Sequence, residues 1–205
     1  MMIIWRIMVM VMLLGWVHCN SKPREELKTM EFQVQDSLLE PVYTDTTLGI
    51  RFSPPKGCVP LDDSTMNLVI GQTEALRSQE MPGRLCRVFF SPQTRIMCFL
   101  SVLECSNESR MDSLWLQQAE HLAKLPSTTG HFTDHFLYKQ FRVRQLMITG
   151  PDRIALKLLF VRSMAACFQL DYSIPAGIYQ SEGHALESSI GSVSLDSSQI
   201  RQINP

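Results

Sequence analysis

Histidines and cysteines are the residue types in this chain whose spacing comes nearest to supporting chemistry. His131 and His135 are four residues apart, and on a helix this spacing places both imidazoles on one face, where they could bind zinc. The alternation around Gly130 favours a loop or strand, in which the two side chains would lie about 13 Å apart, too far for one ion. No glutamate follows His131, so the metalloprotease pattern is also missing. The sequence therefore predicts no metal site.

A thiol nucleophile is the second chemistry to consider. Cys105 could in principle pair with His121, His131 or His135 as its base, but no local motif supports any of these pairs. The sequence also lacks a nucleophile elbow, a phosphate-binding loop and a dinucleotide fingerprint. We therefore expect no catalytic residue and no cofactor, and we predict that the protein is not an enzyme.

The chain has six cysteines but no C-x-x-C motif, so a redox pair or a zinc knuckle is not supported. Cys86 and Cys98 flank a predicted hairpin turn at Ser91-Pro-Gln-Thr94, which makes them the candidate disulfide. The alternative is that these cysteines are small buried apolar side chains.

The charge pattern restricts the class of partner. With 19 basic and 20 acidic residues the formal net charge is −1, which argues against a dedicated nucleic-acid-binding protein. Lys139, Arg142 and Arg144 lie close together in the sequence, and the two arginines would share one face of a strand. They form a candidate patch for an anionic partner; the alternative is an ordinary solvated sheet face.

The first nineteen residues have the pattern of a signal peptide. Arg6 precedes an apolar run, Ile7 to Val17, that is too short to cross a bilayer and ends in a polar exit. A retained signal-anchor is the alternative. Cys19 followed by Asn-Ser resembles the start of a bacterial lipoprotein, in which the cysteine is acylated, whereas ordinary cleavage would follow Ser21. We therefore expect export in a bacterium, to the periplasm or to a membrane through a lipid on Cys19.

The rest of the chain divides into a polar tether at residues 20–45, one domain at 46–195 and a tail at 196–205. Alternation predicts strands near 48–52, 84–91, 95–105, 132–139, 141–149, 153–162 and 166–174. Capping residues and apolar spacing predict helices within 62–80, from Ser109 to Leu125 and from Pro175 onward. Short turns cannot join parallel neighbours, so the fold class is α+β, an antiparallel sheet of six to seven strands flanked by helices.

Two segments resemble the PsbP-like family of small exported or lumenal domains. One is Leu48-Gly-Ile-Arg-Phe-Ser-Pro-Pro-Lys-Gly57, and the other is Phe168-Gln-Leu-Asp-Tyr-Ser-Ile-Pro175 followed by Leu186-Glu-Ser-Ser-Ile-Gly-Ser192. The resemblance covers about residues 42–195 and is that of a bacterial exported lipoprotein-type member. It implies an α/β/α sandwich and a non-enzymatic accessory or binding domain with no catalytic residues.

Three functions follow from these observations. The first is an exported domain that binds a protein of the cell envelope, whose identity the sequence does not give. The second is a carrier that holds an apolar small molecule between sheet and helices. The third is an envelope hydrolase, which the missing motifs disfavour.

Overall fold

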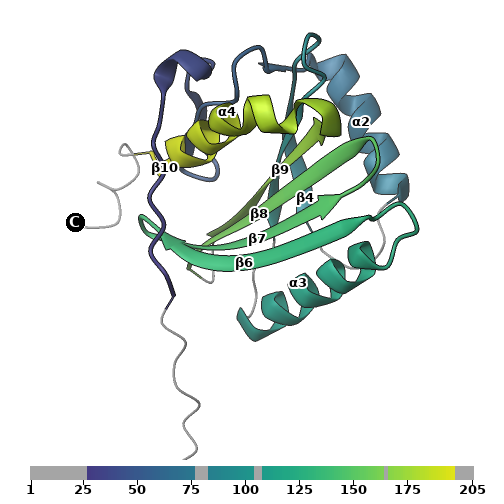
Figure 1. The fold of residues 1–205 in the computed structure, drawn as a ribbon. Coiled ribbons are helices and arrows are strands. Elements are labelled where there is room, and N and C mark those ends of the chain that lie inside the picture. Colours follow the sequence, from purple (N-terminus) through teal and green to yellow (C-terminus); the bar gives the residue numbers. More distant parts are fainter. Residues whose placement is uncertain (1–26, 77–82, 104–107, 164–165, 197–205) are drawn as a thin grey trace, which may run out of the picture.

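The computed structural model describes residues 27–76, 83–103, 108–163 and 166–196 (Figure 1). Its main sheet has seven strands, all paired antiparallel. In spatial order they are β3 (Val59–Pro60), β4 (Gly83–Phe90), β5 (Met97–Leu103), β9 (Ala166–Pro175), β8 (Arg153–Ser163), β7 (Phe141–Thr149) and β6 (Gly130–Tyr138). The predicted α+β fold class is therefore confirmed.

The remaining elements cover this sheet. A small second sheet contains β1 (Tyr43–Asp45), β2 (Ile50–Phe52) and β10 (Ser194–Leu195). The helices are α2 (Asp63–Leu76), α3 (Glu108–Ala123) and α4 (Tyr179–Ser192), with short 3-10 turns η1 (Asp36–Leu38) and η2 (Ala176–Ile178). In Figure 1, α4 lies on one side of the curved sheet and α3 on the other, so the chain forms the layered sandwich expected of its pattern.

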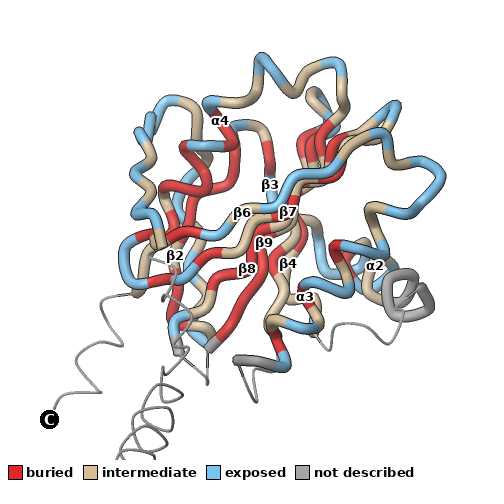
Figure 2. Tube along the Cα trace, turned by 60° about the horizontal axis from the view of Figure 1, so that its bottom comes forward, coloured by how far each residue is buried: buried red, intermediate tan, exposed pale blue. Residues whose placement is uncertain are grey.

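The face of the sheet under α4 carries the larger core. Aromatic side chains dominate it: Phe160 and Phe168 stack with ring centroids 4.8 Å apart, and Phe141 meets both rings edge-on at 5.6 Å. Leu186 and Ile190 of α4 close the cluster from above. Figure 2 shows the buried residues concentrated along the strands and on the inner side of α4. The region between these layers, where a carrier would hold its ligand, is occupied by this cluster of side chains.

A second, smaller core lies under α3. Met111, Trp115 and Ala119 repeat every four residues, as one face of a helix requires, and they pack on Leu146 and Leu159 of the sheet. The helix predicted from Ser109 to Leu125 is thus confirmed, as α3. None of the helices within the described ranges is long and apolar enough to span a bilayer.

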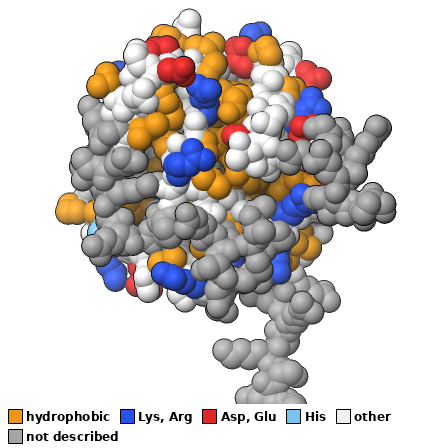
Figure 3. Space-filling model, turned by 180° about the vertical axis from the view of Figure 1, so that it is seen from behind, with side chains coloured by type: hydrophobic (Ala, Val, Ile, Leu, Met, Phe, Trp, Pro, Cys, Tyr) orange, Lys and Arg blue, Asp and Glu red, His pale blue; other side chains and the backbone are white. Residues whose placement is uncertain are grey.

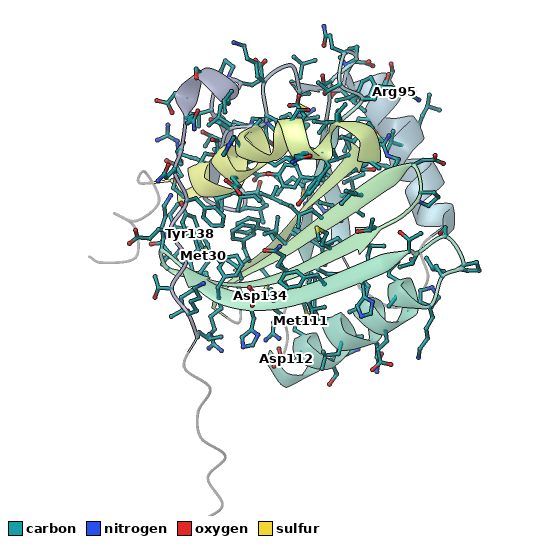
Figure 4. All side chains as sticks on the ribbon, in the orientation of Figure 1. Met30, Arg95, Met111, Asp112, Asp134 and Tyr138 are labelled. Carbon is teal, nitrogen blue, oxygen red and sulfur yellow. The ribbon has the colours of Figure 1, made fainter. Side chains whose placement is uncertain are left out.

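Residues 28–40, which we call the N-terminal strap, lie against the body. The N–H of Leu137 donates to Lys28 O at 2.9 Å, and Met30 donates back to Leu137 O at 2.8 Å. Phe32 packs edge-on against Tyr138, with ring centroids 4.9 Å apart. Figure 4 shows Met30 and Tyr138 close together at the same end of β6. This part of the expected tether therefore belongs structurally to the domain.

The Pro-Lys-Gly turn holds the strap and the body together. Gly57 has φ +81°, a conformation that disfavours any side chain, and its N–H donates to Glu40 Oε1 at 2.6 Å. Lys56 N–H donates to Leu38 O at 2.9 Å. The residue pattern of this segment thus has a structural cause, a turn that joins η1 to the start of the domain.

Candidate protein-binding face

The structure separates the residues of the predicted basic patch. Lys139 turns toward the end of α4, where its ammonium donates to Gly191 O at 3.1 Å and to Val193 O at 2.7 Å. Arg144 lies on the α3 side and forms an ion pair with Asp112. Arg142 is exposed on that same side, opposite Val161 in the strand register. The three residues therefore do not form one patch, because Lys139 lies on the α4 side and bonds carbonyl oxygens, whereas Arg144 lies on the α3 side and pairs with Asp112.

The predicted Cys86–Cys98 disulfide is also wrong. Both thiols are free, because the β4–β5 register places Cys98 opposite Phe89, three residues away from Cys86. Cys167 is the disulfide-bonded cysteine of the described chain. Since Cys58 is free as well, the partner of Cys167 lies outside the described residues, as does the lipidation candidate Cys19.

Two of the free thiols, those of Cys58 and Cys98, are placed where they cannot act as nucleophiles. Burial raises the pKa of Cys58 to about 12 and holds the pKa of Cys98 well above its usual range. Both side chains are almost fully enclosed, at 1% and 0% exposure. Since the thiolate is the reactive form, these cysteines are chemically inert in the folded chain.

A buried chain of polar groups beside these thiols has a structural role. The Tyr172 hydroxyl and Ser189 Oγ share a hydrogen bond of 2.9 Å, and Ser189 donates onward to Ser53 O at 2.7 Å. Ser53 N–H donates to Ser192 Oγ at 2.8 Å. These hydrogen bonds join β9, α4 and the residue after β2, and the polar atoms named here are all paired. It thus fixes α4 on the sheet, beyond the reach of a substrate.

The two histidines considered for zinc lie on β6, where both are exposed. His131 is opposite Ile148 and His135 is opposite Arg144 in the register, so three residue pairs lie between them. The interpretation of this segment as a strand is confirmed. Within the described ranges, no group of three or more His, Cys, Asp or Glu side chains is arranged to hold a metal ion.

The opposite face of the sheet has a half-exposed band between two helices. Among the described elements, α2 packs on β4 and α3 packs on β6 and β7, so β5, β9 and β8 lie between them. Several side chains of these strands point to this face and are only partly buried. We call seven of them the central strip: Met97, Phe99, Arg153, Ala155, Lys157, Asp171 and Ser173.

An ion pair forms the middle of the central strip. Lys157 Nζ lies 2.8 Å from Asp171 Oδ2, and the two side chains are 19% and 22% exposed. Gln169, almost fully buried, donates to both carboxylate oxygens of Asp171 at 2.7 and 2.8 Å. The carboxylate is thus held by an ammonium and an amide, which fixes its position before any partner arrives.

Arg153 fixes the far end of the strip in the same way. Its Nε donates to Ser173 Oγ at 2.8 Å, and its Nη2 donates to the carbonyl oxygens of Ser173 and Arg95 at 2.8 and 2.9 Å. The Ser173 hydroxyl therefore accepts a hydrogen bond from a cation, whereas a nucleophilic serine donates its proton to a base. This geometry supports recognition and gives no support for catalysis.

Three members of the strip are of types that occur often in protein interfaces. Methionine, phenylalanine and arginine are enriched in the cores of such interfaces, and Met97, Phe99 and Arg153 lie around the ion pair of the strip. Viewed from behind, the molecule exposes hydrophobic side chains with basic ones set among them (Figure 3). This face was not predicted from the sequence, although the alternation of Gln169, Asp171 and Ser173 with apolar neighbours was its signal.

The fold defined by these elements is an antiparallel α+β sandwich of the PsbP-like type. The solution structure of cyanobacterial PsbP (CyanoP) from Synechocystis sp. PCC 6803 superposes on 79% of this chain and 95% of its own, with a TM-score of 0.50 and 12% identity. The crystal structure of the Saccharomyces cerevisiae Ran-binding protein Mog1p covers 79% of this chain and 97% of its own, with a TM-score of 0.46 and 13% identity. No family model matches the chain, and no curated protein matches it.

Proposed function

We propose that this chain is an exported, non-enzymatic accessory domain that binds another protein of the cell envelope through the central strip. The observation that carries the proposal is the partly exposed pair Met97 and Phe99 beside an ion pair whose hydrogen bonds are already satisfied. Such a surface offers apolar area to a partner without leaving a charge unpaired on binding. The rigid central strands of the sheet hold it in place, so little ordering cost opposes association.

Export is supported by two independent features. The leader at residues 1–19 has the form of a signal peptide, and Cys19 offers a site for acylation. Cys167 is disulfide-bonded, and structural disulfides persist in oxidising compartments such as the periplasm. We therefore propose that the domain acts in the periplasm, free or held to a membrane through a lipid on Cys19. The mass of the mature N-terminus tests this, because cleavage after Ser21 would remove Cys19.

Site-specific crosslinking in cells tests the binding face. A photoreactive phenylalanine analogue at Met97 should give one discrete adduct with an envelope protein. The same analogue at Val34, which is 43% exposed on the strap, is the control and should give none. A charge placed in the strip by Phe99→Arg, at a residue outside both core clusters, should abolish the adduct without changing the melting temperature. Equal labelling from both positions, or an adduct that persists in Phe99→Arg, would refute the assignment of this face.

A further inference from the structure

The outer edge of β6 is only partly paired. At Leu137 both backbone groups bond outward, to Lys28 and Met30 of the strap. In an antiparallel strand the outward groups recur at every second residue, so His135, Thr133 and His131 also present their N–H and C=O groups away from β7. The Asp134 carboxylate accepts the His135 N–H at 2.8 Å. Among the described residues, no strand pairs with the edge at Thr133 and His131.

The other edge of the same sheet is protected in the usual way. There β3 is two residues long, Val59–Pro60, and proline cannot donate to a further strand. In contrast, β6 has nine residues and contains no proline. Within the described sheet, β6 is therefore the edge that can accept another strand.

An apolar side chain lies at the middle of the open segment. Phe132 is 48% exposed and lies between His131 and Thr133, on the α4 side of the sheet. The N–H and C=O groups of His131 and Thr133 point outward, whereas those of Phe132 point toward β7. If a strand were added at this edge, Phe132 would therefore lie in a non-hydrogen-bonded pair with it. In such pairs the side chains of opposite strands approach most closely.

A second exposed apolar residue lies on the helix that covers β6. Leu116 of α3 is 59% exposed, whereas Leu114, on the opposite side of the helix, packs into the core beneath the helix. Leu116 is four residues after Asp112, which reaches Arg144 on β7. The helix α3 runs in the same direction as β7, and Leu116 lies on the same flank of α3 as Asp112. Because the helix is right-handed, this flank faces β6, and Leu116 therefore points past β6, beyond the edge of the sheet.

We propose that the open edge of β6 binds the same edge of a second copy of this chain, so that two sheets join across a two-fold axis. Antiparallel pairing of His131 with the Thr133 of the second copy uses the outward groups of both residues and forms four backbone hydrogen bonds by symmetry. In this register Phe132 meets its own counterpart on the axis. Gly130 lies opposite Asp134, so no like charges face each other across the strands.

The covering helices are compatible with this arrangement. Neighbouring strands lie about 4.8 Å apart, so a helix placed over β6 and β7 lies about 4.8 Å to one side of the axis. The two copies of α3 would then be about 10 Å apart, which is the distance at which helices pack. Ala123, seven residues after Leu116 and on the same side of α3, offers a small surface for the Leu116 of the second copy. The dimer goes beyond the proposed function, since it places two central strips on one side of a continuous sheet.

Sedimentation of the purified mature protein over a range of concentrations tests the proposal. We expect a reversible dimer whose Kd rises at least about tenfold in Thr133→Pro, which removes an outward N–H, and in Leu116→Lys. Leu68→Lys is the matched control, because Leu68 is 69% exposed on α2, and it should leave the dimer unchanged. A wild-type monomer at every concentration, or a dimer unaffected by both edge variants, would overturn the proposal.

Engineered cysteines test the register and do not depend on how Thr133→Pro folds. Phe132→Cys should form a disulfide-linked dimer on mild oxidation, because two copies of this residue face each other. Thr133→Cys should crosslink far less, because each copy faces His131 of the other. Equal crosslinking of the two variants would contradict the register. Since neither variant touches the central strip, crosslinking from Met97 to an envelope protein can succeed or fail independently of dimer formation.

Discussion

Gly191, near the end of α4, lies so close to Phe32 of the strap that a β-carbon built on the glycine would be 2.6 Å from the Phe32 Cβ. The same glycine has its carbonyl oxygen bonded by the Tyr138 hydroxyl and by Lys139 Nζ. The strap, the β6–β7 hairpin and the end of α4 therefore meet at one residue, and this contact depends on the missing side chain.

Gly191→Ala should therefore destabilise the domain, although alanine is the better helix former. Overpacking against Phe32 should cost about 1–3 kcal/mol of unfolding free energy, measured in urea. Gly183→Ala is the control in the same helix, because nothing lies within 4 Å of its added methyl. That variant should be stabilised by about 0.5–1 kcal/mol. Equal effects of the two substitutions would mean that the strap does not pack on Gly191 in solution.

Much of this fold could be predicted from hydrophobic period. The strands of the 132–174 region alternate strongly, so their bounds and their antiparallel pairing follow from the sequence. The position of β9 between β5 and β8 could not be read in this way, because it joins segments about seventy residues apart. The short strands β1, β3 and β10 also escaped prediction, because two or three residues give no period.

The candidate sites were harder to predict than the fold. The sequence does not show in which direction a charged side chain points. Lys139 points to the end of α4 because its backbone has φ +50°, at the two-residue turn between β6 and β7. The cysteine register depended on the length of the turn, since residues 91–96 separate β4 from β5 and place Cys98 opposite Phe89. In the sequence the central strip appears only as polar residues within a strand. Its partial exposure depends on the positions of the helices α2 and α3, which the sequence does not give.

Lys139 should contribute to stability through the carbonyl groups that end α4. A cation at a helix C-terminus is favourable, and this ammonium makes two hydrogen bonds there, at 2.7 and 3.1 Å. Lys139→Met should lower the unfolding free energy by about 1–2 kcal/mol. Lys124→Met should change it by less than about 0.5 kcal/mol, because Lys124 is exposed and pairs only with Glu120 on the helix surface. A similar small change in both variants would exclude this role for Lys139.

The disulfide partner of Cys167 should be Cys105. Leu103 is opposite Cys167 in the β5–β9 ladder, and Cys105 follows Leu103 by two residues in the sequence. Cys19 is the other cysteine outside the described residues, and the proposed processing either acylates or removes it. Peptide mapping without reductant should therefore join the Cys105 and Cys167 peptides. Reduction should lower the unfolding free energy by about 2–4 kcal/mol, whereas a Cys19–Cys167 peptide would contradict both the pairing and the processing.

Accessible thiol chemistry should distinguish the three free cysteines. Cys86 is half-buried, whereas Cys58 and Cys98 are enclosed by the core. A maleimide should therefore label Cys86 first in the folded protein and the other two only after unfolding. Cys86→Ser should remove the fast phase and leave the slow one. Fast labelling of Cys58 would show that the turn after Gly57 opens more readily than its hydrogen bonds suggest.

Alkaline pH should weaken the fold through Cys58. Burial raises the pKa of this thiol to about 12, while a thiol in the unfolded chain titrates near about 8.5. Between these values the unfolded state has lost a proton that the folded state keeps, so the unfolding free energy falls as pH rises, by up to about 1.4 kcal/mol per pH unit for this group. Below about 8.5 the contribution is constant. Urea unfolding of Cys58→Ala from pH 8 to 10.5 should show a slope shallower than the wild type by one proton, and parallel slopes would mean that Cys58 is not buried in the folded chain.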